Sequence, residues 1–299
     1  MSVQLKIARA GPLVTIQDAG RRGYFQDGIS ASGPMDVGAF NYAGDMLGTS
    51  ATTGLEITTA GVDFTISGGE ISVSFTGGEF TLFINGVALG WNCIQLLKSD
   101  DFVEVKPGPK GNYGYIRFNA DIDVPKVLGS RSTNLIVSLG GLEGRALMAG
   151  DVLGFVPATE APAAAQKVTP DNDGAPIRFI WGIHADHFNA KVRDDLNTKP
   201  FHISTRMDRM GVRLVDDQKI FADARILSLV SEPVVSGDIQ ILGDGTPIIL
   251  MRDHQPTGGY PRIGTVISAD LDRFAQLRPG AEVHFNSVTV DHAQLVRRK

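Results

Sequence analysis

The chain has 299 residues, 42% of them hydrophobic and 20% charged, which is enough for a sizeable core in one large domain or two ordinary ones. A net charge of −5, with no Lys/Arg run longer than the last three residues, argues against nucleic acid as a partner. The single cysteine, Cys93, excludes an internal disulfide, and no stretch approaches 18 consecutive apolar residues. We therefore expect a cytoplasmic protein without a membrane anchor or an apolar leader.

The predicted elements are mostly short strands. Residues 3–11 and 11–18 alternate like strands, and the run from Met35 to Met46 has apolar residues at helical spacing, with Ser32 as the expected cap. From Gly54 to Phe118, short strands separated by Gly, Asn, Asp and Pro follow one another, which is typical of a barrel or a sandwich. Within the first of them, alternation predicts that Glu56 faces solvent.

Two halves are expected. Residues 157–175 are rich in Ala and Pro and poor in large apolar side chains, which predicts a linker or a long exposed loop. It separates an N-terminal half, 1–156, from a C-terminal half, 176–299, in which the same strand texture returns. The fold class expected from this pattern is mainly β.

The stretch 249–275 concentrates polar side chains in a glycine-rich turn between two apolar runs. Gly258 and Gly259 permit close approach of a ligand to the backbone, while Pro256 and Pro261 stiffen the turn. We expect an exposed loop at the end of a sheet, and we expect chemistry there. The polar residues of this loop are Arg252, Asp253, His254, Gln255, Thr257 and Tyr260.

The same stretch has an internal echo. When Tyr24 is aligned with Tyr260, a series of Gly, Ser, Asp and Ala residues matches without a gap, and one insertion then pairs Asp18 with Asp253. A weaker echo pairs GSRST (129–133) with STRMD (204–208). The order of the two units differs between the halves, so we interpret them as permuted copies.

Other polar clusters leave alternatives open. Arg206, Asp208, Arg209 and Arg213 suit bidentate binding of a carboxylate or phosphate, or equally an internal salt-bridge cluster. Ser130 and Ser132 flank Arg131 without a neighbouring His, which favours a capped turn over a nucleophile.

Neither a metal site nor a nucleotide fold is indicated. His184, Asp186 and His187 have a ligand-like spacing, but the sequence shows no third well-placed ligand, so polar residues at a helix start are the better interpretation. No metal is expected. Neither GxxxxGK[ST] nor GxGxxG opening a helix occurs.

Several segments together are similar to a known family. VTIQDAGRRGYFQDGISASGPMDVGAF, VLGSRSTN followed by GGLEGRALMAGD, STRMDRMGVRL, and ILMRDHQPTGGYPRIGTVISADLDRFAQLRPG resemble the biotin-dependent carboxyltransferase family, and within it the group formed by allophanate hydrolase subunit 2 and the C-type subunits of 5-oxoprolinase. The resemblance runs from about Leu5 to Ala293. It implies carboxyltransferase subdomains A and B, with two β-barrel-like halves of cyclophilin-like character and a few short helices.

The resemblance also implies a function. It suggests a subunit of an ATP-dependent 5-oxoprolinase, active only with a companion B-type subunit and a lactam-utilisation-type subunit. ATP would be a co-substrate of the complex, not necessarily bound by this chain. One alternative is a biotin-dependent carboxyltransferase component acting on urea or a related amide, although the chain has no biotinyl Met-Lys-Met segment. Another is a regulatory protein that binds a kinase inhibitor.

Residue roles follow as expectations. Arg206 and Arg209 would anchor anions beside Asp208, and Asp253 or His254 would act as acid or base, in an exposed loop whose substitution leaves stability unchanged. The positioning groups would be Gln255, Thr257, Gly258, Gly259 and Tyr260. The echoed unit offers a possible second site that holds its own half together, binds an anion or faces a partner, comprising Asp18, Arg21, Arg22, Ser130 and Arg131.

Overall fold

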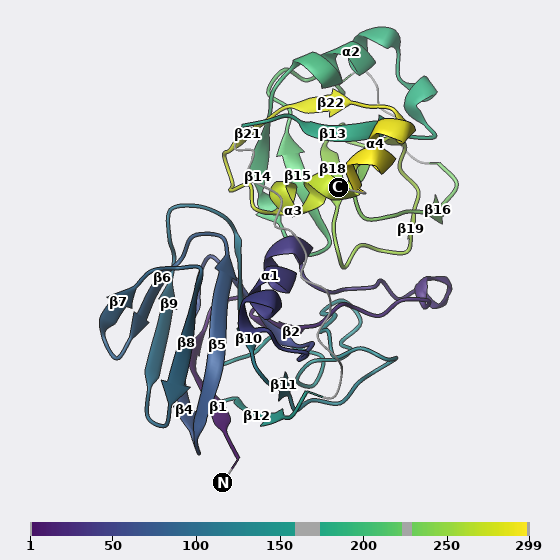
Figure 1. Cartoon of the computed structure of the whole chain (residues 1–299). Coiled ribbons are helices and arrows are strands. Elements are labelled where there is room, and N and C mark those ends of the chain that lie inside the picture. Colours follow the sequence, from purple (N-terminus) through teal and green to yellow (C-terminus); the bar gives the residue numbers. More distant parts are fainter. Residues whose placement is uncertain (1, 159–173, 223–228, 298–299) are drawn as a thin grey trace. The chain divides into compact units, whose positions relative to one another are not determined.

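The computed structural model describes residues 2–158, 174–222 and 229–297. Its contacts divide the chain into two compact units (Figure 1). Unit 1 comprises Met1–Arg22 and Ala31–Thr169, and unit 2 comprises Gly23–Ser30 and Pro170–Lys299. The segment Gly23–Ser30 thus groups with the second unit, although it lies inside the predicted first half. The predicted linker, 157–175, falls almost entirely outside the described residues.

Unit 1 is built on two sheets. The seven-stranded sheet has the order β11 (Asp121–Ile122), β12 (Val152–Val156), β1 (Gln4–Ala10), β4 (Val62–Ser67), β9 (Phe102–Lys106), β6 (Thr81–Ile84) and β7 (Val87–Leu89). The five-stranded sheet has the order β2 (Thr15–Gln17), β3 (Gly54–Thr58), β10 (Tyr113–Phe118), β5 (Glu70–Gly77) and β8 (Cys93–Lys98). Apolar side chains from both sheets form one continuous core, which removes most of their apolar area from water.

Helix α1 (Val37–Leu47) covers the other face of the five-stranded sheet. The helix begins one residue after Asp36, whose side chain accepts a hydrogen bond from the Ala39 amide, so Asp36 is the cap and Ser32 is not. It ends at Gly48, which is in the left-handed conformation.

Glu56 corrects a sequence-based prediction. It is fully buried, because α1 lies over the sheet face that alternation assigned to solvent. Its Oε2 accepts hydrogen bonds from the Met35 amide at 2.7 Å and from the Tyr115 hydroxyl at 3.0 Å. The Tyr115 hydroxyl in turn accepts from the Asp36 amide at 2.7 Å. Alternation along a strand indicates its two faces, but it does not indicate which layer covers each face.

Unit 2 contains an eight-stranded, barrel-like sheet. Its order is β21 (Glu282–Val283), β14 (Phe201–Met207), β15 (Gly211–Val215), β18 (Pro247–Leu250), β17 (Asp238–Ile241), β20 (Arg262–Val266), β13 (Ile177–Trp181) and β22 (Phe285–Ser287). The pairs are antiparallel apart from β13 with β22. A small sheet pairs β16 (Glu232–Pro233) with β19 (Thr257–Gly258).

Short helices complete unit 2: η1 (Phe25–Asp27), η2 (Ala185–His187), α2 (Ala190–Thr198), α3 (Ser268–Ala275) and α4 (Val290–Arg297). The prediction of a mainly β chain with barrel-like sheets and a few short helices is confirmed. No helix in the described part of the chain is long and apolar enough to cross a membrane.

Candidate functional site

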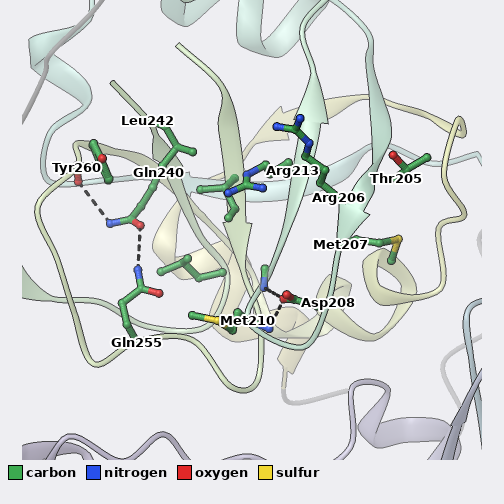
Figure 2. A pocket seen from close by; sticks show the side chains of 13 residues that line it. Thr205, Arg206, Met207, Asp208, Met210, Arg213, Gln240, Leu242, Gln255 and Tyr260 are labelled. Carbon is green, nitrogen blue, oxygen red and sulfur yellow. Dashed lines mark hydrogen bonds between the residues drawn. The ribbon is translucent and has the colours of Figure 1, made fainter. Parts of the chain in front are cut away.

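A pocket lies against one face of the eight-stranded sheet in unit 2 (Figure 2). Val212, Ile249 and Ile239 pair across β15, β18 and β17 and are buried in the core. The adjacent row points to the opposite face, because successive side chains of a strand alternate. That row is Arg213, Ile248 and Gln240, and it lines a cavity of about 390 Å³.

Two cationic side chains line this pocket. Arg206 on β14 and Arg213 on β15 stand across from each other, since the neighbouring pair is Met207 with Val212. Neither guanidinium makes an ion pair or a side-chain hydrogen bond within the part of the chain that the structure describes. Hydrogen bonds from Thr246 lower the pKa of Asp244, and the charge of Arg213 lowers it further. The pair therefore offers donors to an anion.

The remaining pocket wall combines amides and apolar groups. Gln255 and Tyr260 line it as predicted sites, and Asp208 lies at its exposed rim. The Asp208 carboxylate accepts from the Met210 and Gly211 amides at 2.7 and 3.1 Å, so it closes the β14–β15 turn.

Sequence reasoning missed Gln240. It is 1% exposed, and its carboxamide lies 3.5 Å from the Tyr260 carbonyl and 3.5 Å from the Gln255 carboxamide. The available signal was a polar residue inside an apolar strand. Thr257, Gly258 and Gly259 do not line the pocket, but a Cβ on Gly258 would collide with Nε2 of Gln240.

Arg209 and Asp253 form a buried ion pair, which corrects the exposed-loop prediction. Their residues are 3% and 2% exposed, with Nε to Oδ2 at 2.8 Å and Nη2 to Oδ1 at 3.1 Å. Neither residue lines the pocket. Arg209 is thus committed to Asp253 and does not anchor an anion in the pocket. The sequence could not assign which arginine of the cluster would turn inward.

His254 is also buried, at 7% exposure. Its Nδ1 lies 2.7 Å from the Gln255 carbonyl oxygen, which can only accept, so Nδ1 carries the proton and Nε2 presents a lone pair. Burial lowers the His254 pKa, against the opposing effects of this hydrogen bond and of the charges on Asp238 and Asp253. The ring lies beside that of Phe25, with centroids 5.6 Å apart. Neutral imidazole is therefore the form near pH 7.

The possible second site in unit 1 is a buried hydrogen-bonded cluster. The Asp18 carboxylate accepts from the Ser130 and Ser132 hydroxyls at 2.5 and 2.6 Å and from the Arg131 amide at 2.6 Å. Burial raises the pKa of Asp18, but these hydrogen bonds, with one from the Gly20 amide, bring it below its ordinary value. The cluster stabilises an ionised Asp18.

The two predicted arginines of that site differ. Arg21 is 2% exposed and donates to the Ser132 carbonyl and to the Ser32 hydroxyl, whereas Arg22 is exposed. Arg21 therefore holds unit 1 together, which was one of the three alternatives.

The two sequence echoes meet in each unit. Asp18 is bound by the segment 130–132, and Asp253 is bound by Arg209, which directly follows the matching segment 204–208. The backbone agrees, since the Asp18 amide donates to the Ser132 hydroxyl and the Asp253 amide donates to the Arg209 carbonyl. The internal duplication itself stays a prediction.

The His184 cluster has a structural role. Nδ1 of His184 accepts from the Arg262 amide at 3.1 Å, and Nε2 lies 3.6 Å from a Glu232 oxygen. Among the described residues, no group of three or more His, Cys, Asp or Glu side chains could hold a metal ion.

The family described as carboxyltransferase domain, subdomain A and B, matches residues 27–287. The chain belongs to this carboxyltransferase family. It is 36% identical to the C-type subunit of the 5-oxoprolinase of Escherichia coli K12, over 98% of this chain and 94% of that protein.

Two solved structures of related proteins share the fold of this carboxyltransferase chain. The urea amidolyase of K. lactis is 25% identical with a TM-score of 0.88 over 99% of this chain, and TTHA0988 is 27% identical with a TM-score of 0.80 over 95%. This chain spans only 19% and 55% of those two proteins.

Proposed function

We propose that this chain is a subunit of an ATP-dependent 5-oxoprolinase that hydrolyses a lactam acid to glutamate, and that the unit 2 pocket binds that acid. The observation that carries the proposal is the near full-length similarity to the C-type subunit of a 5-oxoprolinase. The pocket supports it, because Arg206 and Arg213 are available to a carboxylate and Gln255 and Tyr260 offer polar groups beside them.

The chemistry of 5-oxoproline suits this lining. The molecule carries a carboxylate on a small ring whose amide is stabilised by resonance. ATP, as co-substrate of the complex, would phosphorylate the lactam oxygen and make the ring carbon open to attack by water. The ring C–N bond then breaks, the nitrogen takes a proton, and phosphate leaves. The guanidinium groups of Arg206 and Arg213 also suit phosphoryl oxygens. We propose His254, with its unprotonated Nε2, as the acid or base.

Partner proteins complete the proposal. We expect a B-type protein and a lactam-utilisation-type protein to assemble with this chain, and the chain to be inactive alone. Co-expression of the three proteins should give ATP-dependent release of glutamate from 5-oxoproline, measured by coupled assay, while the purified chain should give none. Hydrolysis by the isolated chain at an ordinary enzymatic rate would contradict the requirement for partners.

Arg213→Met tests the pocket within that assembly. The variant should raise KM for 5-oxoproline by about 10- to 100-fold with little change in kcat, because it removes a charge-assisted hydrogen bond made in ground and transition states alike. Lys191→Met, on the exposed side of α2, is the matched control. An unchanged KM would place the acid elsewhere.

A second function has its own support. The K. lactis urea amidolyase matches 99% of this chain with a TM-score of 0.88, which favours biotin-dependent carboxyl transfer to urea or a related amide. Urea has no carboxylate, so it would leave the Arg206 and Arg213 charges uncompensated. Transfer of carboxyl from carboxybiotin to urea by the assembled complex, without hydrolysis of 5-oxoproline, would favour this alternative.

A further inference from the structure

We infer that Gln240, Gln255 and Gly258 form a relay that turns the carboxamide oxygen of Gln255 into the pocket, where it accepts the ring N–H of a lactam acid. The inference rests on the proposed function, because it specifies how the pocket recognises the proposed substrate. None of the three residues needs to react, so they are positioning and specificity residues.

The relay starts at a backbone carbonyl. The Tyr260 oxygen can only accept a hydrogen bond, so the Gln240 atom that lies 3.5 Å from it must be Nε2. That orientation turns the Gln240 oxygen towards Gln255, where only Nε2 of Gln255 can donate to it, again at 3.5 Å. Gln240 is 1% exposed, so water does not compete freely for its amide.

The consequence falls on Gln255. Its nitrogen faces Gln240, so its oxygen is directed to the side of the pocket that Met210 lines (Figure 2). A carboxamide oxygen accepts and cannot donate, which makes this wall of the pocket selective for an N–H group.

Gly258 provides the room for the relay. Its backbone is not in the left-handed region, so conformation alone does not require glycine there. A Cβ would collide with Nε2 of Gln240 and come within 3.2 Å of the Val234 side chain. Alanine at this position would therefore displace the Gln240 amide, which is the end of a flexible side chain, at little cost to the fold.

The ligand class follows from the whole lining. Arg206 and Arg213 complement a carboxylate, and the Gln255 oxygen complements an N–H on the same small molecule. A lactam acid carries both groups. Its N-methyl derivative keeps the carboxylate and loses the N–H.

The test compares 5-oxoproline with N-methyl-5-oxoproline in calorimetric binding to the full chain, alone and assembled with its partner proteins. The wild type should bind 5-oxoproline about 3- to 10-fold more tightly, the effect of one neutral hydrogen bond. Gly258→Ala and Gln255→Leu should abolish that preference, chiefly by weakening 5-oxoproline binding. Gly90→Ala should preserve it, since a Cβ there meets no atom within 4 Å.

The outcomes separate this inference from the proposed function. An active complex whose preference for the N–H compound survives in both variants overturns the relay alone. An inactive complex in which the preference is present and is lost in the variants overturns the oxoprolinase proposal alone. Absence of binding by either compound overturns both. If Gly258→Ala does not fold, Gln255→Leu decides the question by itself.

Discussion

The Asp253 carboxylate is held on two oxygens by the Arg209 guanidinium in a buried position. Asp253→Asn removes the negative charge and leaves the Arg209 charge buried without compensation. We expect the free energy of unfolding to fall by about 3 kcal/mol, as for other buried pairs that lose one partner. Urea denaturation measures the change.

Two further variants check that explanation. Asp208→Asn makes the same chemical change at an exposed turn, where Asn can still accept from the Met210 and Gly211 amides, so its effect should stay below about 1 kcal/mol. Arg209→Met combined with Asp253→Leu removes both charges and should recover part of the loss. Equal effects of the two Asp→Asn changes would refute a special role for the buried pair.

The His254 imidazole makes stability depend on pH. Its pKa is lowered in the folded state, so below about pH 6.5 the unfolded chain binds a proton that the folded chain resists. Stability should therefore fall as pH decreases through about 6.5 towards the folded-state pKa. His254→Asn keeps a donor near the Gln255 carbonyl and cannot titrate.

Urea midpoints at about pH 7.5 and about pH 5.5 measure this dependence. The variant should lose less stability between the two than the wild type does. Some dependence should persist, because burial also lowers the pKa of His184. Identical slopes in both proteins would show that His254 is not the group responsible.

Helix α1 is tied to the five-stranded sheet through the Tyr115 hydroxyl. That hydroxyl donates to Glu56 and accepts from the Asp36 amide at the start of the helix. Tyr115→Phe should lower the free energy of unfolding by about 1–3 kcal/mol, because it leaves buried polar groups with one partner fewer.

Tyr42→Phe is the control for that loss, since its side chain is 39% exposed on the same helix and should cost little. Thermal melts of both variants compare them directly. A Tyr115→Phe protein as stable as the wild type would mean that the helix is held by its apolar contacts alone.

The strands between Gly54 and Phe118 were predictable because alternation and turn residues are local signals. Glu56 was misread because its surroundings depend on α1, which comes from elsewhere in the chain. Likewise, the sequence placed Arg206, Arg209 and Arg213 together but could not tell which side chain would be buried. Register decided it, since Arg213 pairs into the row that faces the pocket. Gln240 needed the same cross-strand information.

Phe25 connects remote parts of the sequence within unit 2. Its ring lies beside His254 and belongs to the segment Gly23–Ser30, which groups with unit 2. Phe25→Ala should uncover the imidazole and move the His254 pKa upwards, towards its ordinary value. An NMR titration of the histidine measures that shift, and Gln26→Ala, an exposed neighbour in η1, should leave it unchanged. Equal pKa values in all three proteins would mean that the aromatic contact does not shield His254.

That arrangement of Gly23–Ser30 has a consequence for biosynthesis. The segment leaves the ribosome near the beginning of translation, whereas the residues it joins are made only after unit 1 is complete. Strict folding of one unit after the other is therefore closed to this chain, although it is the usual route for two-domain proteins. Between those two moments an aromatic segment waits without its partners, so the nascent chain is vulnerable for most of its synthesis.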